Sequence, residues 1–126
     1  MRLLLDTHVV LWQLAGSRPL GPTARAAIAA ASELRFSVVS FAEIGVKVAV
    51  GKLSVPAGVE DHVTRSGLRL LGLTAAHGLH VSMLPLHHRD PFDRLLVAQA
   101  AIEGLTLVTA DERLDAYAIE VLDAVG

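Results

Sequence analysis

Short apolar runs recur along the chain and predict buried β-strands. The runs at residues 2–5, 34–39, 70–73 and 106–109 are rich in Leu, Val, Phe or Thr, as strands buried inside a sheet commonly are. Val121 and Leu122 mark a fifth, shorter candidate near the end of the chain. The pattern therefore predicts four or five short strands.

Helical patterns fill the stretches between these runs. Apolar residues at helical spacing follow Asp6, alanines dominate the second stretch, and Gly104 stops the last long helix. Thr23 and Ser40 are the expected N-cap residues of the second and third helices. We expect helices at residues 9–14, 24–31, 41–51, 56–66 and 91–103, with a helical turn at 74–80.

The alternation of short strands and helices predicts the fold class. Right-handed crossovers between parallel strands place helices on both faces of a sheet. We expect an α/β fold of three layers, α/β/α, with a four- to five-stranded, mainly parallel sheet. No linker divides the chain, so residues 1–126 are expected to form a single domain. In such sheets, binding sites form beyond the carboxyl ends of the strands.

Composition narrows the chemistry. The 126 residues include 11 Lys and Arg against 13 Asp and Glu, a net charge of −2, and 52% are hydrophobic. This composition excludes a disordered chain, and without a basic excess any phosphate contact must be local or pass through metal ions. Because the chain has no cysteine, disulfides, cysteine-zinc sites and thiol nucleophiles are excluded.

The chain also lacks the patterns of export and membrane insertion. Asp6 and His8 interrupt the apolar stretch near the N-terminus, where a signal peptide needs an unbroken one. Residues 70–88 contain no Asp, Glu, Lys or Arg, but glycines, a proline and four histidines break up the segment. We therefore expect a cytoplasmic protein without a membrane span.

Four carboxylates are expected to converge at one edge of the sheet. Asp6 ends the first strand and Asp111 follows the fourth, so both belong at the carboxyl edge. Asp93 shares its helical face with the apolar residues at +3, +4 and +7, which directs its carboxylate inward. Glu43 similarly shares a face with Val46 and Val50 and has Lys47 at +4.

Each acid alone also has a purely structural interpretation. Asp6 and Asp111 could cap the helices that follow them, and Glu43 with Lys47 could be an ordinary (i, i+4) pair. Together, however, four acids at one edge repel one another, and bound cations relieve such repulsion. Carboxylate oxygens are the natural ligands of Mg²⁺ and Mn²⁺. Such an ion activates a water molecule for attack on a phosphoryl group, so phosphodiester hydrolysis is the reaction that best fits these acids.

Four motifs resemble those of a known family. The segments LLLDTHVVLW, SFAEIGVK, RDPFDRLLVAQA and LVTADERL are similar to the acidic motifs of PIN domains, in the order seen in VapC-type toxins of bacterial toxin–antitoxin pairs. The resemblance covers nearly the whole chain and implies a metal-dependent endoribonuclease with a cognate antitoxin. It implies that Asp6, Glu43 and Asp93 hold Mg²⁺ or Mn²⁺, and that Asp111 completes this site or a second one.

Other residues near these motifs have less specific roles. Asp90 either caps its helix or braces Asp93, and the proline that follows it favours the cap. Thr109 could orient an acid or a water molecule, or simply belong to its strand. Lys47, Arg89, Arg94 and Arg113 are candidate RNA contacts, with solvated surface as the alternative. A zinc site built from His77, His80, His87 and His88 is conceivable, although the ligand spacing is not typical of one.

Three rival functions remain open at this point. One is a metal-dependent phosphatase of another α/β fold, although the Asp-x-Asp motif expected after its first strand is absent here. Another is a phospho-acceptor signalling domain, which would need a lysine beyond a later strand. The third is a non-catalytic binding module, against which the four acidic motifs argue.

The high apolar content also predicts a homodimer joined through helix faces, in which Trp12 could take part.

Overall fold

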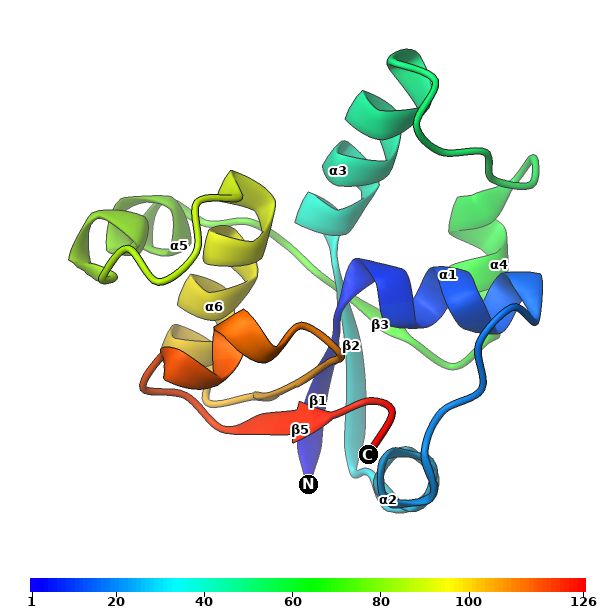
Figure 1. The fold of residues 1–126 in the computed structure, drawn as a ribbon, viewed down its shortest axis with the longest axis horizontal. Helices are drawn as coiled ribbons and strands as arrows, with labels where there is room; N and C mark the ends of the chain where they lie inside the picture. Colours follow the sequence, from blue (N-terminus) through cyan, green and yellow to red (C-terminus); the bar gives the residue numbers. More distant parts are fainter.

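A computed structural model describes residues 1–126, and its centre is a five-stranded sheet (Figure 1). The strand order is β3-β2-β1-β4-β5, and all four pairings are parallel. This confirms the predicted α/β class. The strands are β1 (Arg2–Leu5), β2 (Glu33–Ser37), β3 (Arg69–Leu71), β4 (Thr106–Thr109) and β5 (Val121–Asp123).

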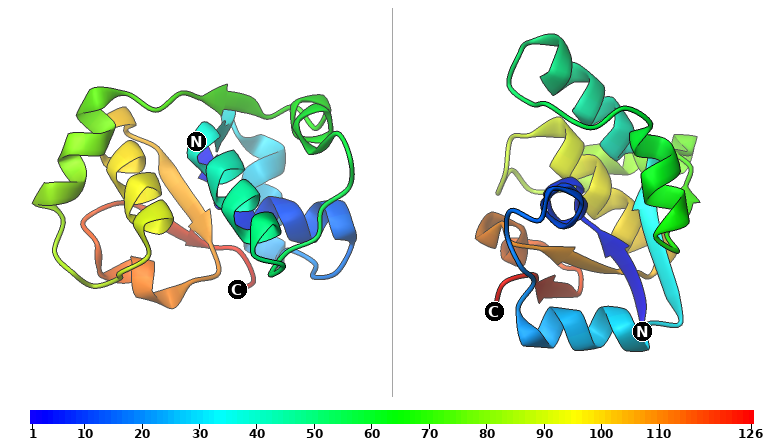
Figure 2. Two further views of the ribbon diagram at one scale, coloured as in Figure 1. Left: turned by 90° about the horizontal axis from the view of Figure 1, so that it is seen from above. Right: turned by 90° about the vertical axis from the view of Figure 1, so that its right-hand side faces the viewer.

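Six α-helices and two short 3₁₀ helices connect the strands and cover both faces of the sheet (Figure 2). The three layers are therefore those expected from the sequence. The α-helices are α1 (Thr7–Ala15), α2 (Pro22–Ala30), α3 (Val38–Ala49), α4 (Val59–Arg65), α5 (Ala75–His80) and α6 (Pro91–Glu103), and the 3₁₀ helices are η1 (Val81–Met83) and η2 (Glu112–Ala116).

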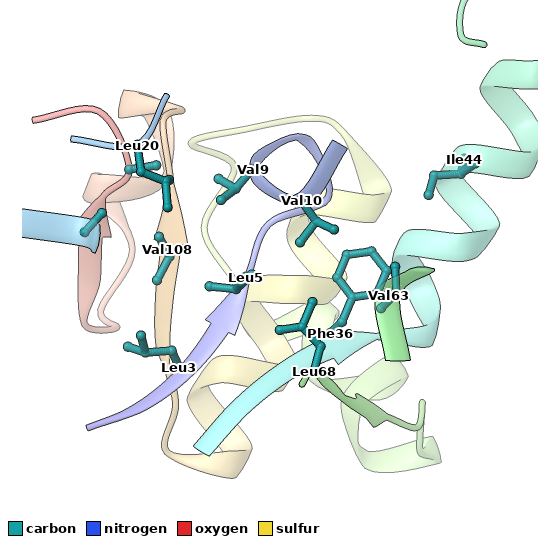
Figure 3. Packing of buried hydrophobic residues seen from close by; sticks show 12 residues of the cluster. Leu3, Leu5, Val9, Val10, Leu20, Phe36, Ile44, Val63, Leu68 and Val108 are labelled. Carbon is teal, nitrogen blue, oxygen red and sulfur yellow. The ribbon is translucent and has the colours of Figure 1, made fainter. Parts of the chain in front are cut away.

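The central strand β1 divides the core into two parts. Leu3 and Leu5 face a cluster with α1, α2 and α4, in which Val10 lies beside Phe36 (Figure 3). Leu4 faces the opposite side, where α6 and η2 cover the sheet. The helices on both sides of the sheet bury both faces of β1, which explains the uninterrupted apolar run from Leu3 to Leu5.

Two helix starts differ from the prediction. The helix α2 begins at Pro22, with Gly21 rather than Thr23 at its N-cap, because proline is well suited to the first helical position. The strand β2 ends at Ser37, and the Ser37 hydroxyl accepts a hydrogen bond from the Val39 amide at 3.0 Å. This cap starts α3 well before Ser40, so the β-branched pair at 38–39, expected to be strand, is helical.

The remaining boundaries follow the prediction closely. Gly104 ends α6 in the left-handed conformation, with φ of 67°, which favours glycine. The helix α4 occupies residues 59–65 of the predicted 56–66 segment. No helix has the length and apolar character needed to cross a bilayer.

Candidate active site

The carboxyl ends of the two central strands hold the first pair of acids. Asp6 follows β1 directly, and its Oδ2 accepts a 2.7 Å hydrogen bond from the hydroxyl of Thr109, the last residue of β4. The same hydroxyl accepts a hydrogen bond from the backbone amide of Asp111 at 3.1 Å. Parallel pairing of β1 with β4 thus brings Asp6 and Asp111 to the same edge, and Thr109 lies between them.

Asp6 stands at the N-cap position of α1 but makes no side-chain capping bond. Capping therefore does not explain this acid. Its Oδ1 is buried and has no hydrogen-bond donor, and the carboxyl group is 6% exposed. Burial raises the pKa of Asp6, and the nearby charge of Glu43 adds to the rise, whereas the bond from Thr109 opposes it.

Glu43 of α3 is 2% exposed and meets Lys47, whose Nζ donates to Oε2 at 2.6 Å. Burial alone would lower the pKa of Lys47, but the bond to Glu43 and its charge outweigh that effect and raise it. The other carboxylate oxygen, Oε1 of Glu43, is buried and lacks a donor. The expected (i, i+4) pair therefore exists and satisfies only one oxygen of the acid.

The reason expected for the burial of Glu43 is wrong. Val46 and Val50, which share its helical face, are 52% and 62% exposed, because α3 extends beyond the sheet (Figure 1). Glu43 is buried because it lies in the part of α3 next to α1 and α6. For Asp93 the expected apolar face is correct: Leu96 and Val97 are fully buried.

The first turn of α6 carries Asp90 and Asp93 in different roles. Oδ1 of Asp90 accepts hydrogen bonds from the amides of Phe92 at 2.8 Å and Asp93 at 3.2 Å, which is N-cap geometry. The Asp93 carboxylate instead points into the site. Burial raises the pKa of Asp93 to about 8, and the charges of Asp6, Asp90, Glu43 and Asp111 add to the rise.

Asp111 is the one acid of the four that is well supplied with donors. Its side chain accepts bonds from the amide, Nε and Nη2 of Arg113 at 2.9 to 3.0 Å, and from Nε2 of His88 at 3.0 Å. The hydrogen bonds from the Arg113 side chain, with a smaller contribution from His88, lower the pKa of Asp111 to about 2. Asp111 therefore caps η2, which is the structural role predicted for it from the sequence, and its carboxylate also lies among the other acids.

The acids line a cavity of about 300 Å³. Two of their buried oxygens, Oδ1 of Asp6 and Oε1 of Glu43, have no donor, and an unpaired buried carboxylate oxygen is costly unless a cation or a proton meets it. A divalent cation bound by oxygen ligands fits this set of donors. The lining consists of Asp6, His8, Trp12, Arg18, Glu43, Lys47, Asp90, Asp93, Ala110, Asp111 and Arg113.

The structure assigns the predicted basic residues to different places. Lys47 and Arg113 line the cavity, whereas Arg89 is exposed outside its lining. Arg94 is buried, and its guanidinium donates to the carbonyls of Pro85, Val81 and Leu84. The prediction that Arg94 contacts RNA is therefore wrong. One residue beyond Asp93 on α6, it lies on the side of the helix that faces the preceding loop.

The histidines do not form the zinc site considered from the sequence. His77 is held by the Thr74 amide at Nδ1 and by Glu103 at Nε2, on the far end of α6 from the acids. Of these four histidines, only His88 contacts the acids, with Nε2 3.0 Å from Oδ2 of both Asp93 and Asp111. From the sequence, the position of His88 two residues before Asp90 suggested only a zinc site and not a contact with Asp93 and Asp111. Trp12 and Arg18 were also not assigned to the cavity.

Comparisons with known proteins agree with this geometry. A family model described as the PIN domain matches residues 3–120. The chain is 33% identical over 122 residues to Ribonuclease VapC22 of Mycobacterium tuberculosis, with 90% of each chain covered. The chain belongs to the PIN-domain family. This excludes the phosphatase and phospho-acceptor folds considered from the sequence, and PIN-domain VapC ribonucleases depend on a divalent metal.

Solved structures share the fold at lower identity. A chain of VapBC2 from Rickettsia felis, bound to a DNA fragment from its promoter, superposes with a TM-score of 0.72 at 16% identity, covering 97% of this chain and 98% of that one. A chain of DNA-bound VapBC from Salmonella typhimurium gives a TM-score of 0.67 at 15% identity, with 98% of each chain covered. Both confirm the three-layer arrangement.

Proposed function

We propose that this chain is a metal-dependent endoribonuclease and the toxin of a toxin–antitoxin pair. The observation that carries the proposal is the acid-lined cavity in which Oδ1 of Asp6 and Oε1 of Glu43 are buried without donors. The name of the VapC22 relative, a ribonuclease, supports the choice of RNA as substrate. Residues 1–126 act as one PIN-like domain in this proposal.

Asp6, Glu43 and Asp93 would hold Mg²⁺, with Mn²⁺ as an alternative, and Asp111 would complete the ligand set. A bound ion of this kind polarises a phosphoryl oxygen and lowers the pKa of an attacking water molecule. Thr109 orients Asp6 through its 2.7 Å hydrogen bond and acts through that acid. Asp90 holds the first turn of α6, and with it Asp93, as an N-cap.

Basic side chains on the rim would hold the RNA backbone. Lys47 and Arg113 each pair with one acid, which leaves further donors on both groups for phosphate oxygens. Arg18 lies over the ring of Trp12, 4.6 Å from its centroid, and both line the cavity. A flat aromatic ring beside a phosphate site is suited to stacking a base of single-stranded RNA.

The proposed partners are a cognate antitoxin, RNA and a second copy of the chain, in the cytoplasm. The VapBC complexes that share the fold support an antitoxin partner. Apolar side chains are exposed on α3, at Val46 and Val48, and at its C-cap, Val50, which supports association through helix faces. Light scattering tests the homodimer, because a monomeric mass at high concentration would contradict it.

RNA cleavage by the purified chain tests the function directly. We expect cleavage with Mg²⁺ or Mn²⁺ and none in EDTA, and Asp6→Asn to lower the rate by orders of magnitude. Arg65→Ala, an exposed change on α4 outside the cavity, serves as the control and should cleave like the wild type. Cleavage that persists in EDTA would contradict the proposed mechanism.

A further inference from the structure

Both ring nitrogens of His88 have partners. Nδ1 lies 3.1 Å from the backbone nitrogen of Asp90, and Nε2 lies 3.0 Å from Oδ2 of Asp111 and 3.0 Å from Oδ2 of Asp93. A backbone N–H can only donate, so Nδ1 must be the acceptor. In a neutral imidazole the proton is then on Nε2, which donates a hydrogen bond to Oδ2 of Asp111.

The surroundings of His88 fix the ring in this orientation. The side chain is 6% exposed, and the backbone amide donates to the hydroxyl of Tyr117 at 3.0 Å. On the other side, Nη1 of Arg94 donates to the His88 carbonyl at 3.4 Å. The buried guanidinium of Arg94 also ties down the loop before His88. The backbone of His88 is thus placed by contacts that do not involve the carboxylates, and the Asp90 amide orients the ring through Nδ1.

His88 is the one side chain in contact with both Asp93 and Asp111. These acids come from different elements, α6 and the turn after β4, and their negative charges repel each other. Asp111 accepts hydrogen bonds from His88 and from Arg113, which is 66% exposed, whereas the Asp93 carboxylate has the 3.0 Å contact with His88 as its only ion pair. A donor between the two carboxylates reduces their repulsion and sets their spacing.

We propose that His88 is a positioning residue that holds Asp93 and Asp111 together through Nε2, which lies 3.0 Å from one oxygen of each acid, and that it does not itself bind the metal. The inference rests on the proposed function, since it concerns the same metal site. The alternative is that His88 is a ligand, because its nitrogen and one oxygen from each acid lie within 4.8 Å of one another. A metal bound to Nε2 would displace its proton, and the contact of His88 with Asp93 and Asp111 would then be lost.

Two amide substitutions separate the two nitrogens of the ring. In His88→Gln, the side-chain NH₂ can replace Nε2 as a donor to the carboxylates. In His88→Asn, the shorter amide oxygen can replace Nδ1 as the acceptor for Asp90 but cannot reach the acids. His88→Ala removes both. His87→Gln is the matched control, because His87 is exposed and packs on Tyr117 instead of on the acids.

Mn²⁺ affinity, measured by calorimetry at constant pH, is the main readout. We expect His88→Gln and His87→Gln to bind Mn²⁺ like the wild type, and His88→Asn and His88→Ala to bind it 10- to 100-fold more weakly, as for other groups that orient metal ligands. Equal weakening in Gln, Asn and Ala would identify His88 as a ligand, and unchanged affinity in all three would show that it has no role. Either result would overturn the proposal.

The tautomer of His88 gives a readout that needs no substitution. Nitrogen NMR of the wild type should show the proton on Nε2 both in EDTA and with Mg²⁺, whereas loss of that proton on Mg²⁺ addition would overturn the proposal. Neither readout depends on RNA. If Mn²⁺ binding follows the expected pattern but no RNA is cleaved, only the proposed function fails. If the wild type binds no Mn²⁺, the metal site and this inference fail together.

Discussion

Thr109 donates its hydroxyl to Asp6 across the pairing of β4 with β1, at 2.7 Å, while the same oxygen accepts the amide of Asp111. One hydroxyl therefore fixes an acid from each of the two central strands. The bond occupies Oδ2 of Asp6, which lines the cavity, and leaves the buried Oδ1 without a donor. The side chain thus determines which oxygen of Asp6 remains available to a ligand.

Replacing Thr109 by valine removes this donor with little change of shape. We expect Thr109→Val to weaken Mn²⁺ binding and RNA cleavage by about 10- to 100-fold, because the orientation of Asp6 is lost. Thr106→Val at the other end of β4 is the control and should change neither. Calorimetry and cleavage assays measure the two effects. Mn²⁺ affinity equal to that of the wild type would show that Thr109 is only a strand residue.

Asp90 and Asp93 are expected to respond differently to the same substitution. Asn is as good an N-cap as Asp, so Asp90→Asn should retain appreciable cleavage, whereas Asp90→Ala should lower the free energy of unfolding by about 1 kcal/mol. Asp93→Asn should lower cleavage by orders of magnitude, since the variant loses a charged ligand. Cleavage rates and thermal melts compare the variants. An equal loss of cleavage in Asp90→Asn would place Asp90 among the ligands.

Much of the fold could be predicted because its signals are local. The strand β1 is apolar from Leu3 to Leu5 since both its faces are covered, and Gly104 marks the end of α6 through its left-handed backbone. The caps of α2 and α3 were misassigned because several residues near each start can cap a helix. Only the surrounding structure decides that Ser37, not Ser40, accepts the amide bond.

The site could be predicted in part for the same reason. The edge of a parallel sheet gathers residues that follow its strands, so Asp6 and Asp111 could be placed from the strand order alone. His88 and Arg94 could not, because their roles depend on the path of the loop between η1 and α6. Trp12 and Arg18 meet the cavity through a cation–π contact that no spacing in the sequence indicates.

Trp12 and Arg18 give a prediction about substrate binding. If a base of the RNA stacks on Trp12, Trp12→Leu should weaken RNA binding by about 1 to 3 kcal/mol per stacked base. RNA that is already bound should be cleaved at a similar rate. Arg18→Ala should act in the same direction. Steady-state kinetics on a single-stranded RNA should show a higher KM with kcat nearly unchanged. A lower kcat at constant KM would argue against a binding role.

The stability of the metal-free protein should depend on pH through Asp93. Its pKa of about 8 in the folded protein lies above the ordinary value of 3.8. Between these values the folded state binds a proton that the unfolded state has released, so the free energy of unfolding falls as pH rises. In EDTA, the wild type should therefore lose more stability between pH 5 and pH 8 than Asp93→Asn, which lacks this proton. Because other groups titrate in both proteins, the difference between their melting temperatures isolates Asp93.

Metal binding should reverse this difference. A ligand that binds only the folded state adds about 2.7 kcal/mol at a hundredfold excess over its dissociation constant, on the order of several degrees in melting temperature. At pH 8 the wild type should gain that shift with Mn²⁺, and Asp93→Asn should lose most of it. If Asp93 interacted only with the positive N-terminal end of α6, its replacement would lower the free energy of unfolding by about 0.3 to 1 kcal/mol, with or without metal. A variant that melts below the wild type in EDTA at pH 8, together with no Mn²⁺ shift in the wild type, would make Asp93 a structural residue.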